Sequence, residues 1–281
     1  GYGIRISMYY PFDTDEAIVS GNIDNGRRGV GRYQLLLTNS EITNPFRQLY
    51  RGIEKANLCI EQIPLMKQYS SGTDLEKKEL RKLHGEALAL RAQFYMELIR
   101  NWGDVPAPMV AAYKQTDLFI PQANRDSTYD ILLADLTAAK DLLPWRTEAG
   151  PRNERVTKGA AMALKARIAL ARGGFSLRSN GQMERRADYL KYYQMAKQEC
   201  EELMARRDQH TLNPSYSDVW RKVTSFTYDP FAEIIFEVGA GGGNGNSDSR
   251  MGNYDGPNMS NASRYGAGCG GVVILPNYFY A

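Results

Sequence analysis

The sequence has 281 residues and a formal net charge of +3, with 43% hydrophobic and 24% charged residues. A chain of this length can bury a large core in one or two domains, and its composition excludes a disordered or a fibrous protein. The basic and acidic residues are balanced and scattered, which argues against nucleic-acid binding. No apolar run reaches the roughly 18 residues that a membrane-spanning helix needs.

The first helix is predicted after a segment, residues 1–41, that is rich in Gly, Asn, Arg and Tyr and has no sustained hydrophobic period. Apolar residues then recur at steps of three and four, the spacing of one helix face, at Phe46, Leu49, Ile53, Ala56, Ile60 and Ile63. Pro64 ends this helix. A second helix is predicted from near Thr73, where Glu76 completes a capping box, to about Asn101.

The third helix follows a proline-containing connection, residues 101–125. It is predicted to begin at Ser127, where acidic residues surround its first turn, and to end at Pro144. Its buried stripe is predicted to consist of Leu132, Leu136, Ala139 and Leu143.

A fourth helix is predicted from Thr157 to the pair Gly173 and Gly174, which is a strong signal for a helix end. A fifth carries an apolar face made of Tyr189, Tyr193, Ala196, Cys200 and Leu203. Free cysteines on such faces are most often buried, so Cys59 and Cys200 are expected inside the protein.

Two of these helices resemble each other in sequence. Residues 87–98 read ALALRAQFYMEL and residues 161–172 read AMALKARIALAR. This offset is a little over twice the ~34-residue period of tetratricopeptide repeats. We therefore expect antiparallel hairpins, the first helix with the second and the third with the fourth, with the fifth opening another pair. The predicted fold is mainly α: a tetratricopeptide-like helical repeat, a right-handed superhelix of hairpins, with irregular loops and a few short strands.

The composition changes after residue 206. The run EIIFEVG, residues 233–239, and the run GVVILPNYFY near the end are strand candidates, and the Gly-rich segment 239–271 between them is predicted to be irregular. We expect one domain over residues 1–281, incomplete at both ends, with parts at 1–41, 42–206 and 207–281.

The sequence W-G-D-V-P at residues 102–106 raises the question of a chemical site. Gly103 stands where a helix end needs a left-handed backbone, and Pro106 forbids continuation of the helix. The motif is therefore interpreted as structural.

Other motifs give no support for catalysis, a cofactor or a metal. Residues 266–271 spell G-x-G-x-x-G but lack the strand-before, helix-after context of a dinucleotide site. The two histidines, His84 and His210, are far apart, and His84 is expected to be either solvated or packed against a helix. Asp13–Glu16 lacks the central Gly of a calcium loop. A carboxylate pair for glycoside hydrolysis stays open, because such pairs are defined by spatial separation.

Four segments in order resemble one family. YRGIEKANLCIEQIP (50–64), LHGEALALRAQFYMELIRNWGDVPAPMV (83–110), STYDILLADLTAAKDLLP (127–144) and RVTKGAAMALKARIALARGG (155–174) are similar to the successive motifs of the SusD/RagB family of outer-membrane nutrient-binding lipoproteins of the Bacteroidetes. EIIFEVG resembles the strand that follows the helical part of that family.

The resemblance implies a non-catalytic protein on the outside of the outer membrane, anchored through an N-terminal lipidated Cys that this chain does not contain. Such proteins cover a SusC-like TonB-dependent transporter and capture glycans for import. The alternative is a peptide-capturing or protein-interaction module of the same uptake complex, because helical-repeat grooves often hold peptides.

The resemblance also implies that ligands are bound by loops, which here correspond to residues 1–41 and 239–271. Sugar recognition needs flat apolar rings together with polar forks that bridge hydroxyl groups. The candidate ligand residues are Tyr9, Tyr10, Asn22, Asp24 and Arg28 in the first segment, and Asn253, Tyr254, Asp255 and Tyr265 in the second.

Overall fold

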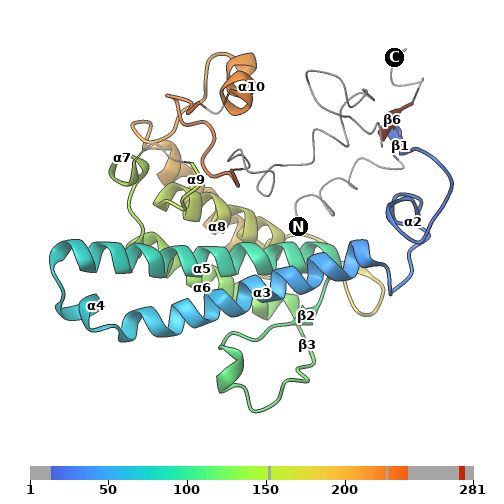
Figure 1. Cartoon of the computed structure of the whole chain (residues 1–281), viewed down its shortest axis with the longest axis horizontal. Coiled ribbons are helices and arrows are strands. Elements are labelled where there is room, and N and C mark those ends of the chain that lie inside the picture. The colour runs from blue at the N-terminus through green and yellow to red at the C-terminus, as the bar shows by residue number, and fades with distance from the viewer. Residues whose placement is uncertain (1–13, 151–152, 226, 240–271, 276–281) are drawn as a thin grey trace, which may run out of the picture. The chain divides into compact units, whose positions relative to one another are not determined.

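The computed structural model describes residues 14–150, 153–225, 227–239 and 272–275 (Figure 1). The chain divides into two compact units, Gly1–Tyr50 with Ala240–Ala281, and Arg51–Gly239. The assignment of all parts to one domain stays a prediction.

In the first unit, strand β1 (Ala17–Val19) pairs antiparallel with β6 (Val272–Ile274), so that Ala17 lies opposite Ile274. Ala17 and Val19 are buried while the residue between them is only partly covered, the two-residue alternation of a strand with one face inward. A one-turn helix, α2 (Arg27–Gly31), follows β1. The strand predicted near residue 273 is confirmed, whereas its partner β1 was not predicted.

In the second unit, long helices are joined by short elements (Figure 1). The long helices are α3 (Ser40–Gln62, which begins in the first unit), α5 (Asp74–Trp102), α6 (Arg125–Leu142), α8 (Lys158–Gly173) and α9 (Tyr189–Met204). The short helices are η2 (Ile63–Leu65), α4 (Lys67–Ser71), η3 (Ala112–Lys114), α7 (Arg146–Ala149) and α10 (Tyr216–Thr224). Two-residue ladders pair β2 (Val105–Pro106) with β3 (Gln122–Ala123), and β4 (Ser176–Leu177) with β5 (Met183–Glu184).

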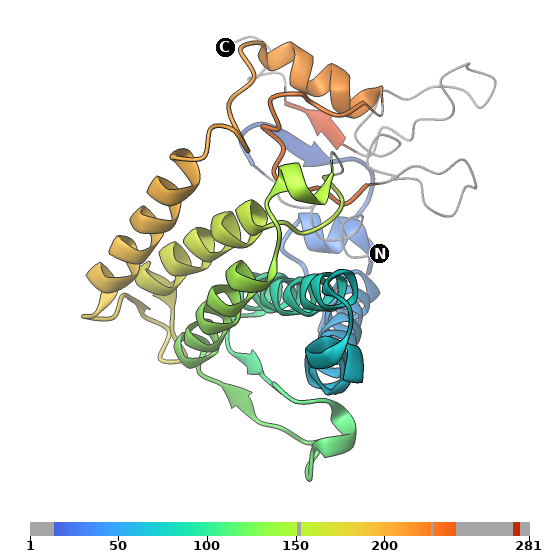
Figure 2. The same ribbon diagram turned by 90° about the vertical axis from the view of Figure 1, so that its left-hand side faces the viewer.

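The helices pack in chain order. Helix α5 contacts α6, α6 contacts α8, and α8 contacts α9, and Figure 2 shows α6, α8 and α9 lying side by side. Helix α3 is joined to α5 by a hydrogen bond from Arg91 to Asn57, and the ring of Phe94 fills the space that Gly52 leaves without a side chain. The predicted hairpins and the tetratricopeptide-like helical fold are confirmed.

The core lies between these helices. The predicted stripe of α6 is buried, with Leu132, Leu136 and Ala139 fully covered. Each fully buried Leu contributes about 1.5–3 kcal/mol relative to an exposed one. Ala92 and Ala161, on α5 and α8, are also fully covered, and their small side chains allow neighbouring helices to approach closely.

Two predicted helix starts are confirmed and one is corrected. Thr73 and Glu76 form the capping box of α5, with Thr73 N–H donating to Glu76 Oε2 at 2.7 Å. Thr157 caps α8. Helix α6 begins at Arg125 rather than Ser127, because the Asn124 side chain accepts the Asp126 N–H at 2.8 Å and caps the helix earlier.

The two cysteines in the described helices are exposed, so the prediction that Cys59 and Cys200 are buried is wrong. On α9 the buried side chains are Tyr192, Ala196 and Glu199. The Glu199 carboxylate accepts hydrogen bonds from lysines on α6 and α8, which turns that face inward and leaves Cys200 outside.

The run 233–239 is not a strand in the structure, and this prediction is corrected. A strand requires a partner for its backbone hydrogen bonds. Among the described residues, Glu237 N–H donates to Asn153 O, which is a single bond to a loop rather than a ladder.

Candidate functional site

The described part of the predicted ligand loops is the turn between β1 and α2. Asp24 Oδ1 accepts the N–H groups of Gly26 at 2.9 Å and Arg28 at 3.2 Å. Arg28 Nη1 donates to Asp24 Oδ2 at 2.8 Å, and its Nε donates to Ser20 O at 2.7 Å. Asn22 lies exposed on the same turn. The structure therefore brings together three of the predicted ligand residues, two of them as an ion pair.

The Asp24 carboxylate is held in its ionised form. Partial burial opposes ionisation, but hydrogen bonds from the N–H of Gly26 and from Arg28 lower the pKa of Asp24 below its ordinary 3.8. The side chains of Arg28 and Asp24 remain 40% and 44% exposed. At neutral pH the turn thus presents a carboxylate acceptor beside a guanidinium donor, a combination that can bridge two neighbouring hydroxyl groups.

An exposed aromatic ring follows the turn and was missed by the sequence reasoning. Tyr33 is 80% exposed and has φ 54°, a left-handed conformation that is uncommon for a bulky residue. Arg32 holds the segment back on the turn by donating to Gly21 O at 2.8 Å. A strained, exposed tyrosine is a reason to consider function. The sequence offered no signal for its backbone conformation.

The other predicted ligand residues lie outside the described residues. They are Tyr9, Tyr10, Asn253, Tyr254, Asp255 and Tyr265, and the G-x-G-x-x-G run at 266–271 lies outside them as well. Their place in a site stays a prediction.

The second unit contains a buried polar network that fixes the loop after α5. Arg91 donates from Nε and Nη2 to the Asp135 carboxylate at 2.9 and 2.8 Å, and from Nη1 to Met109 O at 2.9 Å. Asn57 donates to Pro108 O and Val110 O. Asn57, Arg91 and Asp135, which lie in the segments with motif similarity, therefore support this loop.

The W-G-D-V-P stretch ends α5, as predicted. Gly103 has φ 75°, and its N–H donates to Ile99 O. Asp104 accepts from Arg125 Nε at 2.6 Å and so links the end of α5 to the start of α6. The structural interpretation of this motif is confirmed at its glycine and its aspartate.

A second exposed aromatic feature lies on α10. Tyr216 and Trp220 are both exposed, with ring centroids 6.2 Å apart in an edge-on arrangement. Ser215 caps the helix and accepts the Asp218 N–H. Aromatic residues four positions apart after a serine could have revealed this pair from the sequence.

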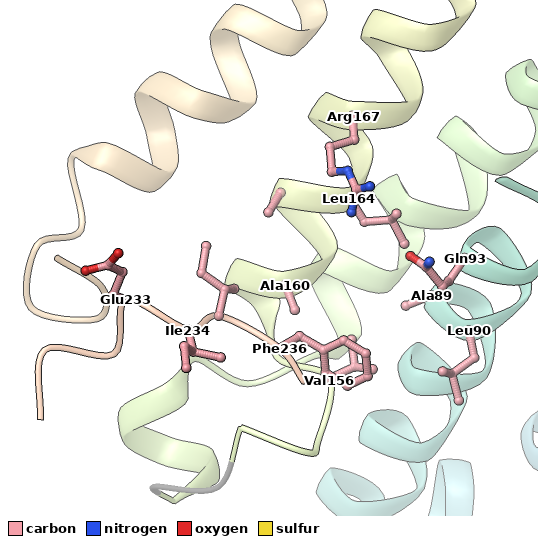
Figure 3. A pocket seen from close by; sticks show the side chains of 12 residues that line it. Ala89, Leu90, Gln93, Val156, Ala160, Leu164, Arg167, Glu233, Ile234 and Phe236 are labelled. Carbon is pink, nitrogen blue, oxygen red and sulfur yellow. The ribbon is translucent and has the colours of Figure 1, made fainter. Parts of the chain in front are cut away.

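A cleft of about 300 Å³ lies between α5, α8 and the segment that follows α10 (Figure 3). Phe236 lies beside Val156 on its apolar floor, while Glu233 and Arg167 lie towards opposite ends. Within the described residues, no group of three or more His, Cys, Asp or Glu side chains could hold a metal ion.

The two histidines of the described chain take part in packing. Tyr69 Oη lies 3.0 Å from His84 Nδ1, and the two rings meet in a T-shaped, edge-to-face arrangement. His210 Nδ1 lies 2.8 Å from Ala232 O. Burial lowers the pKa of both imidazoles below the ordinary 6.5. Of the two roles expected for His84, solvated or helix-packed, the structure shows packing against Tyr69 of α4.

Comparison with known families decides what this architecture is. A family model for SusD-like proteins, described as "Starch-binding associating with outer membrane", matches residues 22–170, more than half of the chain. The chain belongs to the SusD-like family. The match begins at Asn22 and ends at residue 170, so it includes most of the β1–α2 turn, Tyr33, and the helices from α2 through most of α8.

Individual SusD-like relatives agree with this assignment. A SusD-like protein, P38, from Formosa agariphila is 33% identical over 94 residues, which cover 33% of this chain and 17% of that protein. The solved structure of a SusD homologue from Bacteroides thetaiotaomicron has a TM-score of 0.80 at 25% identity and matches 97% of this chain. A second solved structure, determined with a xylogluco-oligosaccharide, shares the fold with a TM-score of 0.57 at 18% identity, over 78% of this chain and 38% of that one.

The SusD-like chain spans about half the length of the Bacteroides homologue that it matches, since 50% of that protein is covered. The family description associates these proteins with the outer membrane. Among the described residues, no helix is both long enough and apolar enough to cross a membrane.

Proposed function

We propose that this SusD-like chain is part of a non-catalytic, surface-exposed outer-membrane lipoprotein that captures oligo- or polysaccharides and delivers them to a SusC-like TonB-dependent transporter. The observation that carries the proposal is the family match over residues 22–170, because it covers both the helical frame and the β1–α2 turn. The relative solved with a xylogluco-oligosaccharide supports a glycan as the class of ligand.

The chemistry of the turn fits a sugar. The exposed ring of Tyr33 offers a flat apolar face for the C–H side of a pyranose, and the Asp24–Arg28 pair offers an acceptor and a donor for its hydroxyl groups. Asn22 adds an exposed amide on the same turn. We propose that Tyr9, Tyr10, Asn253, Tyr254, Asp255 and Tyr265 complete the ligand contacts.

The loop between β2 and β3 suits the transporter contact. Its apolar tip, Leu118 and Phe119, is exposed, Phe119 to 92%. The base of the loop is fixed to α3, because Glu61 accepts from Ala111 N at 2.8 Å and from Tyr113 Oη at 3.0 Å. A rigidly held apolar tip is a suitable anchor for a protein partner, because exposed apolar groups that become buried dominate such interfaces.

Calorimetric titration of the whole chain with a panel of neutral polysaccharides and oligosaccharides tests the glycan proposal. We expect Tyr33→Ala to weaken binding of the best neutral glycan by about tenfold, because a stacked ring is lost. Tyr113→Ala is the matched control, since Tyr113 is also exposed but lies in the β2–β3 loop. Glycan binding by this variant should be unchanged.

Binding of peptides in preference to all glycans in the same titration would contradict the glycan proposal and favour the peptide-capturing alternative. The transporter role is tested separately, by co-purification of the transporter from outer membranes. Phe119→Asp should reduce co-purification and leave glycan binding intact. Unchanged recovery of the transporter would contradict this docking role of the loop.

A further inference from the structure

A second and larger hollow lies away from the β1–α2 turn, at one end of the helical unit. It has a volume of about 1000 Å³ and is formed where α5 ends, α6 begins and α8 ends, and residues of the β4–β5 hairpin also line it. A hollow of this size is sufficient for a small ligand. None of the residues proposed above to bind neutral glycans lines it.

The charges that line this hollow are predominantly positive. Arg100, Arg125 and Arg178 line it, against the single carboxylate of Asp104. Asp104 is already paired with Arg125 through a bond of 2.6 Å. Arginine carries a planar set of donors that suits carboxylate and sulfate groups. The lining therefore favours an anionic ligand.

Arg178 provides a second, independent indication that the hollow binds a ligand. It follows strand β4, its side chain is 8% exposed, and its Nη1 donates to Asp126 Oδ2 at 2.8 Å. Its Nε is buried and has no hydrogen-bond partner among the described residues. Most buried polar groups in proteins do have a partner, so an unpaired donor is a rare feature in an arginine that lines a hollow.

The same hollow has rings for a sugar. Trp102 and Phe175 both line it, and Phe175 is 62% exposed. The Arg185 guanidinium lies 4.8 Å from the centroid of the Phe175 ring and helps to fix its position. Rings beside guanidinium groups combine a stacking surface for a pyranose with donors for its acidic substituent.

We propose that this hollow is a binding site for an anionic saccharide, one that carries a carboxylate or sulfate group, with Arg178 and Arg100 contacting the acidic group and Phe175 stacking on the ring. The saccharide class rests on the proposed function, but the site and its preference for anions are independent of the turn at Asn22.

Titration of the whole chain with trigalacturonate, a sulfated galacto-oligosaccharide and a neutral galacto-oligosaccharide tests the proposal. We expect at least one of the acidic sugars to bind at least tenfold more tightly than the neutral one, with an affinity that falls as salt is raised. Arg178→Gln and Arg100→Gln should each weaken that binding by about tenfold. Arg186→Gln is the matched control, because Arg186 also donates to Asp126 Oδ2 at 2.8 Å but does not line the hollow.

The variants separate a loss of contact from a loss of fold. Arg100 is exposed, so Arg100→Gln is expected to fold even where Arg178→Gln does not. Equal affinity for acidic and neutral sugars, no binding of either acidic sugar, or unchanged binding by Arg100→Gln would overturn the proposal. Tighter binding of triglutamate than of both acidic sugars would overturn the saccharide assignment.

A different set of results would contradict the proposed function without contradicting the anionic-saccharide site. In that case no neutral glycan binds and Tyr33→Ala has no effect, while acidic sugars still bind at Arg100 and Arg178. The β1–α2 turn is then not a glycan site, but the hollow is.

Discussion

Opposite charges are paired both in the helical unit, Arg51–Gly239, and on the β1–α2 turn, but the two pairs differ in how far they are exposed to solvent. The side chains of Arg91 and Asp135 are 7% and 11% exposed and join α5 to α6. Those of Arg28 and Asp24 are 40% and 44% exposed and lie within one turn of chain. The first pair stabilises the packing of helices, whereas the second remains accessible to a ligand.

The difference explains how one molecule can hold a fixed frame and a variable binding surface. A buried charge that loses its partner is strongly destabilising, so such pairs constrain the frame. An exposed pair contributes little to stability, so its residues can be exchanged for others without unfolding the protein.

Removal of one partner from the buried pair should have the largest effect. Asp135→Ala leaves Arg91 buried with its Nε and Nη2 donors unpaired. We expect the free energy of unfolding to fall by about 3–5 kcal/mol, measured by urea denaturation. A loss below about 1 kcal/mol would show that the buried Arg91–Asp135 pair contributes no more to stability than an exposed pair does.

Adding a side chain at Gly103, at the end of α5, should lower the free energy of unfolding by a smaller amount. Gly103→Ala places a Cβ 2.7 Å from Arg125 Nη2 and forces alanine to adopt φ 75°. We expect a loss of about 1–3 kcal/mol in unfolding free energy. Gly181→Ala is the control for backbone strain alone, because its φ is 77° but its Cβ would meet no atom within 4 Å. Equal losses in both variants would show that the Arg125 contact contributes nothing.

The stability of the helical unit should depend on pH through His210. Burial lowers the pKa of His210 below 6.5 in the folded protein, so the unfolded chain binds more protons as the pH falls below that value. The free energy of unfolding should therefore rise with pH up to about 7 and then level off. Urea denaturation between pH 5 and 8 measures this, and His210→Gln should reduce the slope and leave the part that comes from His84, whose pKa burial also lowers. The same slope in the variant would assign the dependence to other groups.

Substitution in the exposed pair should have the smallest effect on stability. Asp24→Asn and Arg28→Gln are each expected to change the unfolding free energy by less than about 1 kcal/mol. Both should nevertheless weaken binding of a neutral glycan in titration, because each removes a charged contact for hydroxyl groups. A change in stability as large as that of Asp135→Ala would show that the turn is part of the frame.

Much of the frame could be predicted from the sequence, because its signals are local. The capping box at Thr73, the stripe through Leu136 and the glycine at position 103 each follow from helix geometry. Helix α6 was placed two residues late because Asn124 and Ser127 are both good caps, and only the hydrogen bond to Asp126 distinguishes them.

The candidate sites were harder to predict, because they depend on contacts between distant segments and on backbone conformation. Cys200 was expected to be buried since the apolar pattern of α9 does not reveal that Glu199 turns inward to meet lysines of α6 and α8. The exposure and left-handed backbone of Tyr33 leave no mark in the sequence. The hollow at Arg178 is assembled from three helix ends and a hairpin, which no local pattern describes.

Hydrogen–deuterium exchange of the whole chain, with and without the tightest-binding neutral glycan, tests most directly whether the helices are a frame and the turn is the binding surface. We predict that the glycan slows exchange at residues 20–37 and leaves the exchange rates of α5, α6 and α8 unchanged. Slowed exchange within those three helices, with none at residues 20–37, would contradict it.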